Sequence, residues 1–346
     1  MEKRVLGMNG PEISVLSFGL MTFSEGDSAF AAIGDTHGQG AERQVAIALE
    51  AGVNLFDTSD NYSGGQSEMI LAHALGKRRK DVLIATKAFG RTGPGEHDIG
   101  LSRTHLIAAC EASLKRLNTD RIDLYQVHNF DSLTPLEETL RALDDLVRTG
   151  KVRFIGCSNH FAWQTVKALG LSERLSLAPY ISQQVQYSLL VRDVEEEILP
   201  AGVDAGLGAL IYSPLAQGYL TGKFSRGEAE GARLIDRDHL RIFDTEQARR
   251  ILETVQTIAA AHQATPGQIA LRWVMQRRGV TSVIFGARTE AQLRDNLGAA
   301  AIDLSQAEMT ELERISQPAR RYPRLAQDVF HPERNPPLFP RPASKP

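Results

Sequence analysis

The stretch IDLYQVHNFDSLTPLEETLRALDDLVRTGKVRFIG, residues 122–156, contains the pattern that decides the fold. Apolar segments of strand length begin and end it, at Ile122–Val127 and Val152–Gly156. The apolar residues between them recur at steps of four, three and four, as on one face of a helix: Leu136, Leu140, Leu143 and Val147. Strand, helix and strand in this order predict a βαβ unit with two parallel strands.

The sequence also predicts where this helix begins and ends. Thr134 is expected to cap its N-terminus, with Pro135 in the first turn and Glu137 completing a capping box. Gly150 stands where a glycine that follows a helix C-terminus belongs. In the same way, Thr265-Pro266 predicts the start of another helix.

The same alternation runs along the chain and predicts eight strands with helices between them. The strands are Val15–Phe18, Val53–Phe56, Val82–Thr86, Ile122–Val127, Val152–Gly156, Ile181–Gln186, Leu207–Tyr212 and Thr281–Phe285. This order is typical of an α/β fold, the (β/α)8 TIM barrel, preceded here by an N-terminal β-hairpin, Lys3–Leu6 with a turn at Asn9-Gly10. We expect one domain over residues 1–317 and a proline-rich, extended C-terminal tail over residues 318–346.

Composition and motif spacing exclude several functional classes. The formal net charge is −3 and Lys and Arg are scattered among acids, which argues against a nucleic-acid partner. No run is long enough to span a membrane, the N-terminus has no apolar leader segment, and the two cysteines form no CxxC spacing. No HxH or HExxH arrangement suggests a metal. We therefore expect a cytoplasmic protein that acts on a small molecule.

Two other nucleotide-binding folds are also disfavoured. No GxGxxG follows an early strand, as a dinucleotide-binding Rossmann domain requires. The sequence GYLTGKF at Gly218–Phe224 superficially resembles a P-loop, but it is one residue short and lacks the Ser or Thr after Lys. Two long insertions, residues 24–40 and 225–244, instead fall on the barrel face that carries active sites, where they are expected to act as lids.

Polar residues collect at the predicted strand ends, which in a barrel point to one mouth. Asp57, Lys87 and His128 follow three successive strands, and each alone has an ordinary alternative: a helix cap, a loop charge or a core histidine. Together they suggest proton chemistry, because a lysine beside a tyrosine stabilises the phenolate and makes the phenol a better acid. Tyr62, five residues beyond Asp57, is the candidate proton donor. Asp57 would hold the ammonium of Lys87, and His128 would orient a substrate carbonyl by hydrogen bonding.

These residues and their order resemble those of the aldo-keto reductase family. The segment GVNLFDTSDNY at Gly52–Tyr62, followed by Gly65, Ser67 and Glu68, is similar to the family signature around its catalytic aspartate and tyrosine. Three more stretches agree in order: Ala85–Lys87, Ile122–His128, and Gly150–Arg153 with Ile155–Asn159. The resemblance covers about residues 4–316. It implies a catalytic tetrad of Asp57, Tyr62, Lys87 and His128, in which the tyrosine protonates a carbonyl oxygen and NADPH supplies hydride.

The resemblance also implies a set of cofactor-binding residues. Ser158, Asn159 and Gln184 match the groups that bind the nicotinamide carboxamide, and Tyr212 matches the ring that stacks on the nicotinamide. The pyrophosphate loop is matched by Ser213, Leu215, Gly218, Leu220 and Lys223, and the adenosine site by Gly286, Arg288, Gln292, Asp295 and Asn296. The first strand end adds Gly19, Leu20 and Met21.

Arg288 is the reason to expect NADPH (NADP+) as the cofactor, because its guanidinium suits a 2′-phosphate. Its alternative is a surface arginine at a helix start. Two positions depart from the family pattern: Gly286, where some branches have a lysine, and Leu20, where a threonine is common. The first departure leaves phosphate binding more dependent on Arg288.

Two functions remain open from the sequence. The intact tetrad favours an enzyme that reduces an aldehyde or ketone reversibly, whereas some relatives of this family are regulatory subunits that sense nucleotide on the same barrel. The tetrad does not specify which carbonyl enters. Six aromatic and apolar loop residues could form the substrate walls, or could equally pack beneath a loop: Phe23, Phe30, Ile33, Phe89, Phe130 and Trp163. Oligomeric state is equally unspecified.

Overall fold

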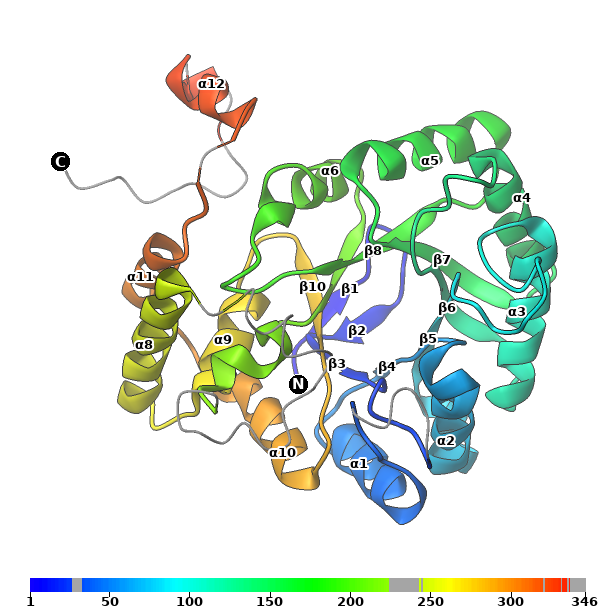
Figure 1. Ribbon diagram of the computed structural model, residues 1–346, viewed down its shortest axis with the longest axis horizontal. Helices are drawn as coiled ribbons and strands as arrows, with labels where there is room; N and C mark the ends of the chain where they lie inside the picture. The colour runs from blue at the N-terminus through cyan, green and yellow to red at the C-terminus, as the bar shows by residue number, and fades with distance from the viewer. Residues whose placement is uncertain are drawn as a thin grey trace.

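A computed structural model describes residues 1–26, 33–223, 243, 245–319, 321–330, 332–334 and 336. Its centre is a closed barrel of eight parallel strands in the order β10-β3-β4-β5-β6-β7-β8-β9 (Figure 1). The strands are β3 (Leu16–Gly19), β4 (Leu55–Asp57), β5 (Leu83–Ala88), β6 (Ile122–Val127), β7 (Val152–Ser158), β8 (Tyr180–Gln186), β9 (Gly208–Tyr212) and β10 (Val280–Phe285). The predicted (β/α)8 barrel is therefore confirmed, with strand ends that differ from the predicted ones by at most two residues.

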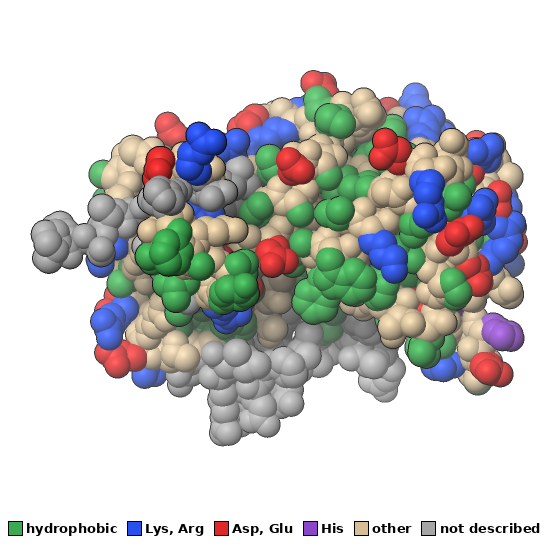
Figure 2. Space-filling model, turned by 90° about the horizontal axis from the view of Figure 1, so that it is seen from above, with side chains coloured by type: hydrophobic (Ala, Val, Ile, Leu, Met, Phe, Trp, Pro, Cys, Tyr) green, Lys and Arg blue, Asp and Glu red, His purple; other side chains and the backbone are tan. Residues whose placement is uncertain are grey.

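Most of the helices surround the barrel, and the last one, in the C-terminal tail, stands away from it, as Figure 1 shows. They are α1 (Gly38–Glu50), α2 (Gln66–Leu75), α3 (Arg103–Arg116), α4 (Leu136–Arg148), α5 (Ala162–Leu175), α6 (Ile198–Asp204), α8 (Glu246–Ala261), α9 (Pro266–Met275), α10 (Glu290–Gly298), α11 (Gln306–Ile315) and α12 (Arg324–Val329). Parallel strands buried on both faces need such a cover, since each carries apolar side chains inward and outward. Acidic and basic side chains are interspersed over the described surface seen in Figure 2.

The predicted hairpin closes one end of the barrel. Strands β1 (Lys3–Val5) and β2 (Glu12–Ser14) pair antiparallel, and Leu6 donates its backbone N–H to the carbonyl of Pro11 across the turn. The side chains of Leu6 and Ile13 are fully buried and pack with apolar residues of the barrel interior. The barrel interior is thus a packed core at the hairpin end, which leaves the opposite end for the site.

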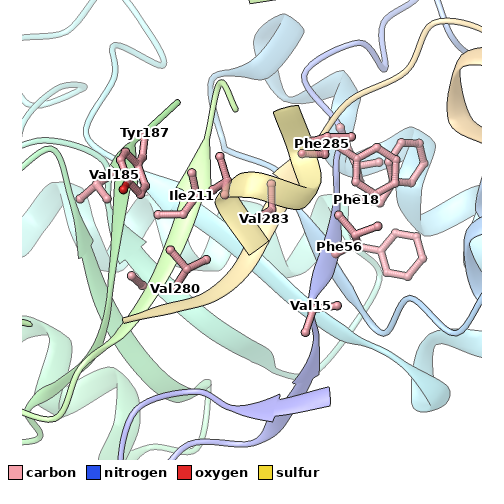
Figure 3. Packing of buried hydrophobic residues seen from close by; sticks show 14 of the residues in the cluster. Val15, Phe18, Phe56, Val185, Tyr187, Ile211, Val280, Val283 and Phe285 are labelled. Atoms are coloured by element: carbon pink, nitrogen blue, oxygen red, sulfur yellow. The ribbon is translucent and has the colours of Figure 1, made fainter. Parts of the chain in front are cut away.

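The larger core lies between the barrel and its helices. An aromatic group marks its centre (Figure 3), where Phe18 stacks on Phe285 at a ring distance of 5.7 Å and meets Phe56 edge-on at 6.1 Å. Phe23 adds a further edge contact to Phe18 at 5.8 Å and is fully buried. Phe23 is therefore a core residue and does not line the cavity, so of its two alternatives the structure has packing and not a substrate wall.

The predicted start of α4 is also wrong. Pro135 is the N-cap residue, and the hydroxyl of Thr134 donates to the Asp131 carboxylate at 2.7 Å instead of capping the helix. The Glu137 side chain accepts a hydrogen bond from Arg141 and completes no capping box. Asp131 forms a competing local turn by accepting backbone N–H groups of the loop, which removes the hydroxyl from the helix end. At the other end, Gly150 follows the helix with φ +76°, as expected.

The C-terminal tail was predicted to be extended, and this is wrong in part. Its described residues include the short helix α12. The ion pair between Arg324 and Asp328, four residues apart at 2.8 Å, stabilises this turn. In Figure 1 the helix stands away from the barrel. Of the two insertions, the first ends where α1 begins at Gly38, and the second lies almost wholly outside the described residues.

Thr265 caps α9 as predicted and offers a stability test. Its hydroxyl accepts from the backbone N–H of Gln268 at 3.3 Å and donates to Asp295 at 3.0 Å. Thr265→Ala should therefore lower the free energy of unfolding by about 1–2 kcal/mol, measured by urea denaturation. Thr257→Ala, an exposed position inside α8, is the control and should change it by less than about 0.5 kcal/mol. Equal effects of the two variants would contradict the cap.

Candidate active site

A cavity of about 700 Å³ opens at the carboxyl ends of the strands, opposite the hairpin. Residues at or just after strand ends line it, from Gly19 of β3 around the barrel to Phe285 of β10. All the predicted cofactor residues except Leu220 line this one cavity, as do Asp57, Tyr62 and His128 of the predicted tetrad. The structure thus brings together groups that are more than two hundred residues apart in the chain.

Lys87 lies beneath the cavity floor and is fully buried. Its ammonium donates to Asp57 Oδ1 at 2.6 Å and to the backbone carbonyl of Thr58 at 2.7 Å. The Tyr62 hydroxyl lies 3.5 Å from the same nitrogen, which is also 5.0 Å from the centre of the Tyr62 ring. Burial alone would lower the pKa of Lys87, but the charges of Asp57 and Tyr62 beside it raise the pKa above its ordinary value. The lysine is therefore held as a cation against the phenol.

The second oxygen of Asp57 is also bound. Its Oδ2 accepts from the amide of Gln184 at 2.8 Å and from the amide of Gln126 at 3.4 Å. Gln126 was not among the predicted site residues, because it lies inside β6 and the sequence marks it as an ordinary strand position. With both amides donating, the carboxylate is satisfied although its side chain is almost fully buried.

His128 stands beside Tyr62 on the rim of β6. The two rings meet edge to face with centres 5.9 Å apart. Its Nδ1 lies 3.3 Å from the hydroxyl of Ser59, a residue that sequence reasoning left without a role. Burial, followed by the charge of Lys87, lowers the pKa of His128 to about 3, so the imidazole is neutral at physiological pH.

A buried acidic pair supports the loop that carries Tyr62. Glu68 accepts from Thr86 and Arg116, at 2.6 Å each, and holds α2 to β5 and α3. Asp60 is buried nearby; burial, followed by the negative charge of Glu68, raises its pKa to about 7. The loop between Asp57 and Tyr62 is tied to α2 by the hydrogen bond between the hydroxyls of Thr58 and Ser67, which lie 2.8 Å apart.

The ends of β7 and β9 form a further part of the cavity wall. The Tyr212 hydroxyl donates to Asn159 Oδ1 at 2.9 Å, and the Asn159 amide donates to the carbonyl of His128 at 3.0 Å. Asn159 has φ +55° and Ser213 φ +51°, left-handed conformations that cost energy outside glycine and occur where a site must be shaped. These bonds connect three strand ends around one opening.

The far end of the cavity lies between β10 and α10. The backbone N–H of Arg288 donates to the side chain of Gln292 at 2.9 Å, and the Asn296 amide donates to the carbonyl of Gly286 at 3.2 Å. Arg288 is part-buried, and burial lowers the pKa of its guanidinium slightly below the ordinary range. A second cation, Lys223, lies against the loop after β9. A Cβ atom placed on Gly218 of that loop would lie 3.3 Å from Nζ of Lys223. Two positive groups, Lys223 after β9 and Arg288 just before α10, thus line the same cavity.

A dinucleotide fits this donor set. Gln217 lines the cavity, and its Oε1 is buried and makes no hydrogen bond to any described residue, which leaves an acceptor for a ligand amide or hydroxyl. At Gly19 any Cβ would approach Ile284 to 2.7 Å, so a bare backbone is required beside the cavity. Cations at one end and amides and a tyrosine ring at the other match a phosphate-bearing cofactor with a nicotinamide head.

Some predictions about the lining are corrected. Leu220 is fully buried, packs into the core and does not line the cavity, unlike the other predicted cofactor residues. Residues that line the cavity without having been predicted to do so include Thr22, Gln186, Thr221 and Asn61, the last of which lies inside the motif around Asp57 and Tyr62. Of the suggested substrate walls, Phe130 and Trp163 pack against each other at 5.9 Å, Ile33 and Phe89 pack inward, and Phe30 lies outside the described residues.

Metal-binding clusters and membrane-spanning helices are both absent from the described residues. Among them, no three or more His, Cys, Asp or Glu side chains gather in a way that would hold a metal ion. None of the helices in the described ranges has the length and apolar character needed to cross a membrane.

Comparison with known proteins places these observations in context. The model of the aldo/keto reductase family matches residues 15–317. An uncharacterized oxidoreductase, YrpG, from Bacillus subtilis (strain 168) is 36% identical over 315 residues, which cover 88% of this chain and 92% of that protein. Probable voltage-gated potassium channel β-subunits from Arabidopsis thaliana and Oryza sativa subsp. japonica are each 34% identical, covering 87% and 86% of this chain and 92% and 91% of theirs.

Proposed function

Because this chain belongs to the aldo/keto reductase family, we propose that it reduces an aldehyde or ketone to the alcohol with NADPH, reversibly, and that Tyr62 donates the proton. Family membership makes it an NAD(P)H-dependent oxidoreductase. The preference for NADPH over NADH and the roles of individual residues are the parts that we propose. One observation supports them most: the Lys87 ammonium lies between the Asp57 carboxylate and the Tyr62 hydroxyl.

The proton step follows from that arrangement. As Tyr62 gives its proton to the carbonyl oxygen, a phenolate develops 3.5 Å from the Lys87 ammonium. A fixed cation beside a developing anion stabilises it strongly in a buried site, because no water must reorganise. Asp57 holds the ammonium in place, and His128 offers a second polar contact to the substrate beside Tyr62. In the reverse direction the same phenolate accepts the proton of an alcohol.

The cofactor supplies the hydride when it is bound. Tyr212 offers a ring surface for the nicotinamide, and the amides of Asn159 and Gln184 offer partners for its carboxamide. Lys223 and Arg288 lie where phosphates would be held, on the loop after β9 and at the start of α10. These residues orient the nicotinamide and leave the Tyr62 side of the cavity for substrate.

Arg288→Ala tests the preference for NADPH. The guanidinium is expected to bind the 2′-phosphate, and a hydrogen bond to a charged group contributes about 1.5–3 kcal/mol. The variant should therefore bind NADPH about tenfold to a hundredfold more weakly, with NADH affinity changed by less than about threefold, as measured by fluorescence titration. Arg294→Ala, an exposed arginine on the same helix, is the matched control. An equal loss of affinity for NADPH and NADH would contradict this role of Arg288.

The direct test is the loss of NADPH absorbance with a panel of aldehydes and ketones, with NADH in parallel. Turnover of any carbonyl with NADPH preferred would support the proposal. Turnover with NADH alone would contradict the cofactor assignment.

A second candidate function rests on the two plant relatives that are named potassium channel β-subunits. On that reading the barrel binds the nucleotide and serves as a regulatory subunit for a partner protein. Tight NADPH binding without turnover across the whole panel would favour this alternative over the enzyme.

A further inference from the structure

The outer face of α5 carries an exposed apolar stripe. Trp163, Val166 and Gly170 follow each other at steps of three and four residues, so they lie on one face of the helix, and all three are exposed. We call these three residues the α5 stripe. Phe161, just before the helix, is exposed as well, and the half-buried ring of Phe130 packs against Trp163. The apolar surface therefore extends from the stripe to the start of the helix.

Two residues of this surface weaken the helix that carries them. Phe161 is the N-cap residue of α5, and a phenylalanine side chain has no oxygen to accept the free N–H groups of the first turn. Gly170 lies inside the helix, where glycine is less favourable than alanine, and a Cβ atom placed on it would meet no atom within 4 Å. Packing within the described chain requires neither residue. A second molecule lying on the stripe explains both, because aromatic side chains are enriched at protein interfaces and glycine allows a close approach.

The tail helix α12 presents a second apolar surface. Leu325 and Val329, four residues apart, and Phe330 at the C-terminal end have exposed fractions of 49%, 62% and 69%. We call these three residues the tail stripe. The charged side chains of Arg324 and Asp328 in the same helix are only 20% and 15% exposed. A helix that packs on its own chain buries its apolar face, so α12 has the reverse arrangement.

This helix is also too short to be stable by itself. It has six residues, and isolated helices shorter than about 12–15 residues are marginal in water. In Figure 1 it stands away from the barrel, along the same upper side of the molecule as α5. Figure 2 looks down on that side and shows hydrophobic side chains at its surface. The described part of the chain leaves the tail stripe uncovered, so an apolar contact that stabilises α12 has to come from another molecule.

We infer that α12 of one copy of this chain docks on the α5 stripe of a second copy, and that the α12 of the second copy docks on the first in return. A two-fold dimer has an isologous interface, in which a surface and its complement belong to the same face of each copy. The two stripes meet this condition, since α5 and α12 lie on the same side of the molecule. Their anchors, three and four residues apart, suit the packing of one helix against another.

The mass of the full-length protein in solution, measured by sedimentation over a range of concentrations, tests the dimer. We expect a dimer in the parent. Val329→Asp in the tail stripe and Gly170→Glu in the α5 stripe should each raise its Kd at least about tenfold, because each places a charge in an apolar contact. The new side chain at Gly170 enters open space, so the fold of the monomer is kept. Met69→Glu, at an exposed apolar position on α2, is the matched control and should leave the Kd unchanged.

Cross-linking tests whether the tail docks on the other copy. Val166→Cys and Val329→Cys are prepared as separate variants, mixed and oxidised with diamide. A disulfide between the two chains is expected in the mixture, and neither variant alone should form it, because each then lacks the opposite cysteine. The two native cysteines, Cys110 and Cys157, are buried and do not compete.

Three results would overturn the inference. The first is a parent that stays monomeric at every concentration. The second is a dimer whose Kd changes in neither Val329→Asp nor Gly170→Glu. The third is a disulfide within single chains of the double variant Val166→Cys/Val329→Cys, with none between the separate variants, since the tail would then dock on its own barrel. These measurements need no turnover, so failure of the proposed function would leave their results unchanged.

Discussion

Tyr62→Phe is expected to lower kcat for carbonyl reduction by about a hundredfold to ten-thousandfold, the usual contribution of a positioned proton donor. The phenol lines the cavity, and its hydroxyl lies 3.5 Å from the Lys87 ammonium. Phenylalanine keeps the ring and its packing against His128, so the change removes the proton and little else. NADPH affinity, measured by fluorescence titration, should stay within about twofold, because the cofactor residues lie on other strands.

The control for this variant is Tyr322→Phe, which removes a phenol from an exposed position in the tail. It should retain the activity of the parent. Full activity in Tyr62→Phe would show that another group protonates the carbonyl. A parallel loss of NADPH binding would show that the tyrosine serves the cofactor instead of the reaction.

Lys87→Met is expected to lower the free energy of unfolding by about 3 kcal/mol as well as abolish turnover. The reason is not the lost attraction alone. Removing the ammonium leaves the Asp57 carboxylate buried beside an apolar side chain, with only the amides of Gln184 and Gln126 as partners. An uncompensated buried charge is among the most destabilising changes that one substitution makes. Denaturant unfolding measures the stability, and NADPH absorbance measures the turnover.

A double variant separates the two effects of Lys87. Lys87→Met combined with Asp57→Asn removes both charges and should recover most of the stability, yet none of the activity. Lys151→Met, which breaks an exposed ion pair with Glu111, is the matched control and should cost less than about 1 kcal/mol. If Lys87→Met is as stable as this control, the buried pair does not have the electrostatic role described here.

The sequence predicts the barrel well because its signals are local and repeated. The segment 122–156 alternates strand and helix patterns of the right length, and the observed β6 has the predicted ends. Tertiary contacts decide the places where prediction fails. Thr134 has the right residue type for a cap, but the Asp131 carboxylate binds its hydroxyl. The tail has the prolines of an extended segment, yet one ion pair four residues apart accompanies a short helix.

The residues of the site show the same difference: the sequence predicts some of them, and tertiary contacts decide the others. Asp57, Tyr62 and His128 stand at strand ends or in a recognisable motif, so their meeting at one mouth follows from the topology. Leu220 carries no sign in the sequence that its side chain turns inward. The contacts of Ser59 could not be predicted from the sequence either. Its hydroxyl meets Asn61 and His128 only because of how the loop after β4 folds, and no sequence spacing indicates that.

The hydrogen bond from Gln184 to Asp57 joins the two halves of the cavity through a single amide. If the same amide binds a cofactor carboxamide, cofactor binding and the proton affinity of the Lys87–Asp57 pair become thermodynamically linked. Linkage of this kind is reciprocal. If cofactor binding changes the protonation equilibrium of the pair, then protonation changes the binding free energy of the cofactor by the same amount, and the cofactor affinity depends on pH. Oxidised and reduced nucleotide, which differ in charge at the nicotinamide ring, would then sense that equilibrium differently.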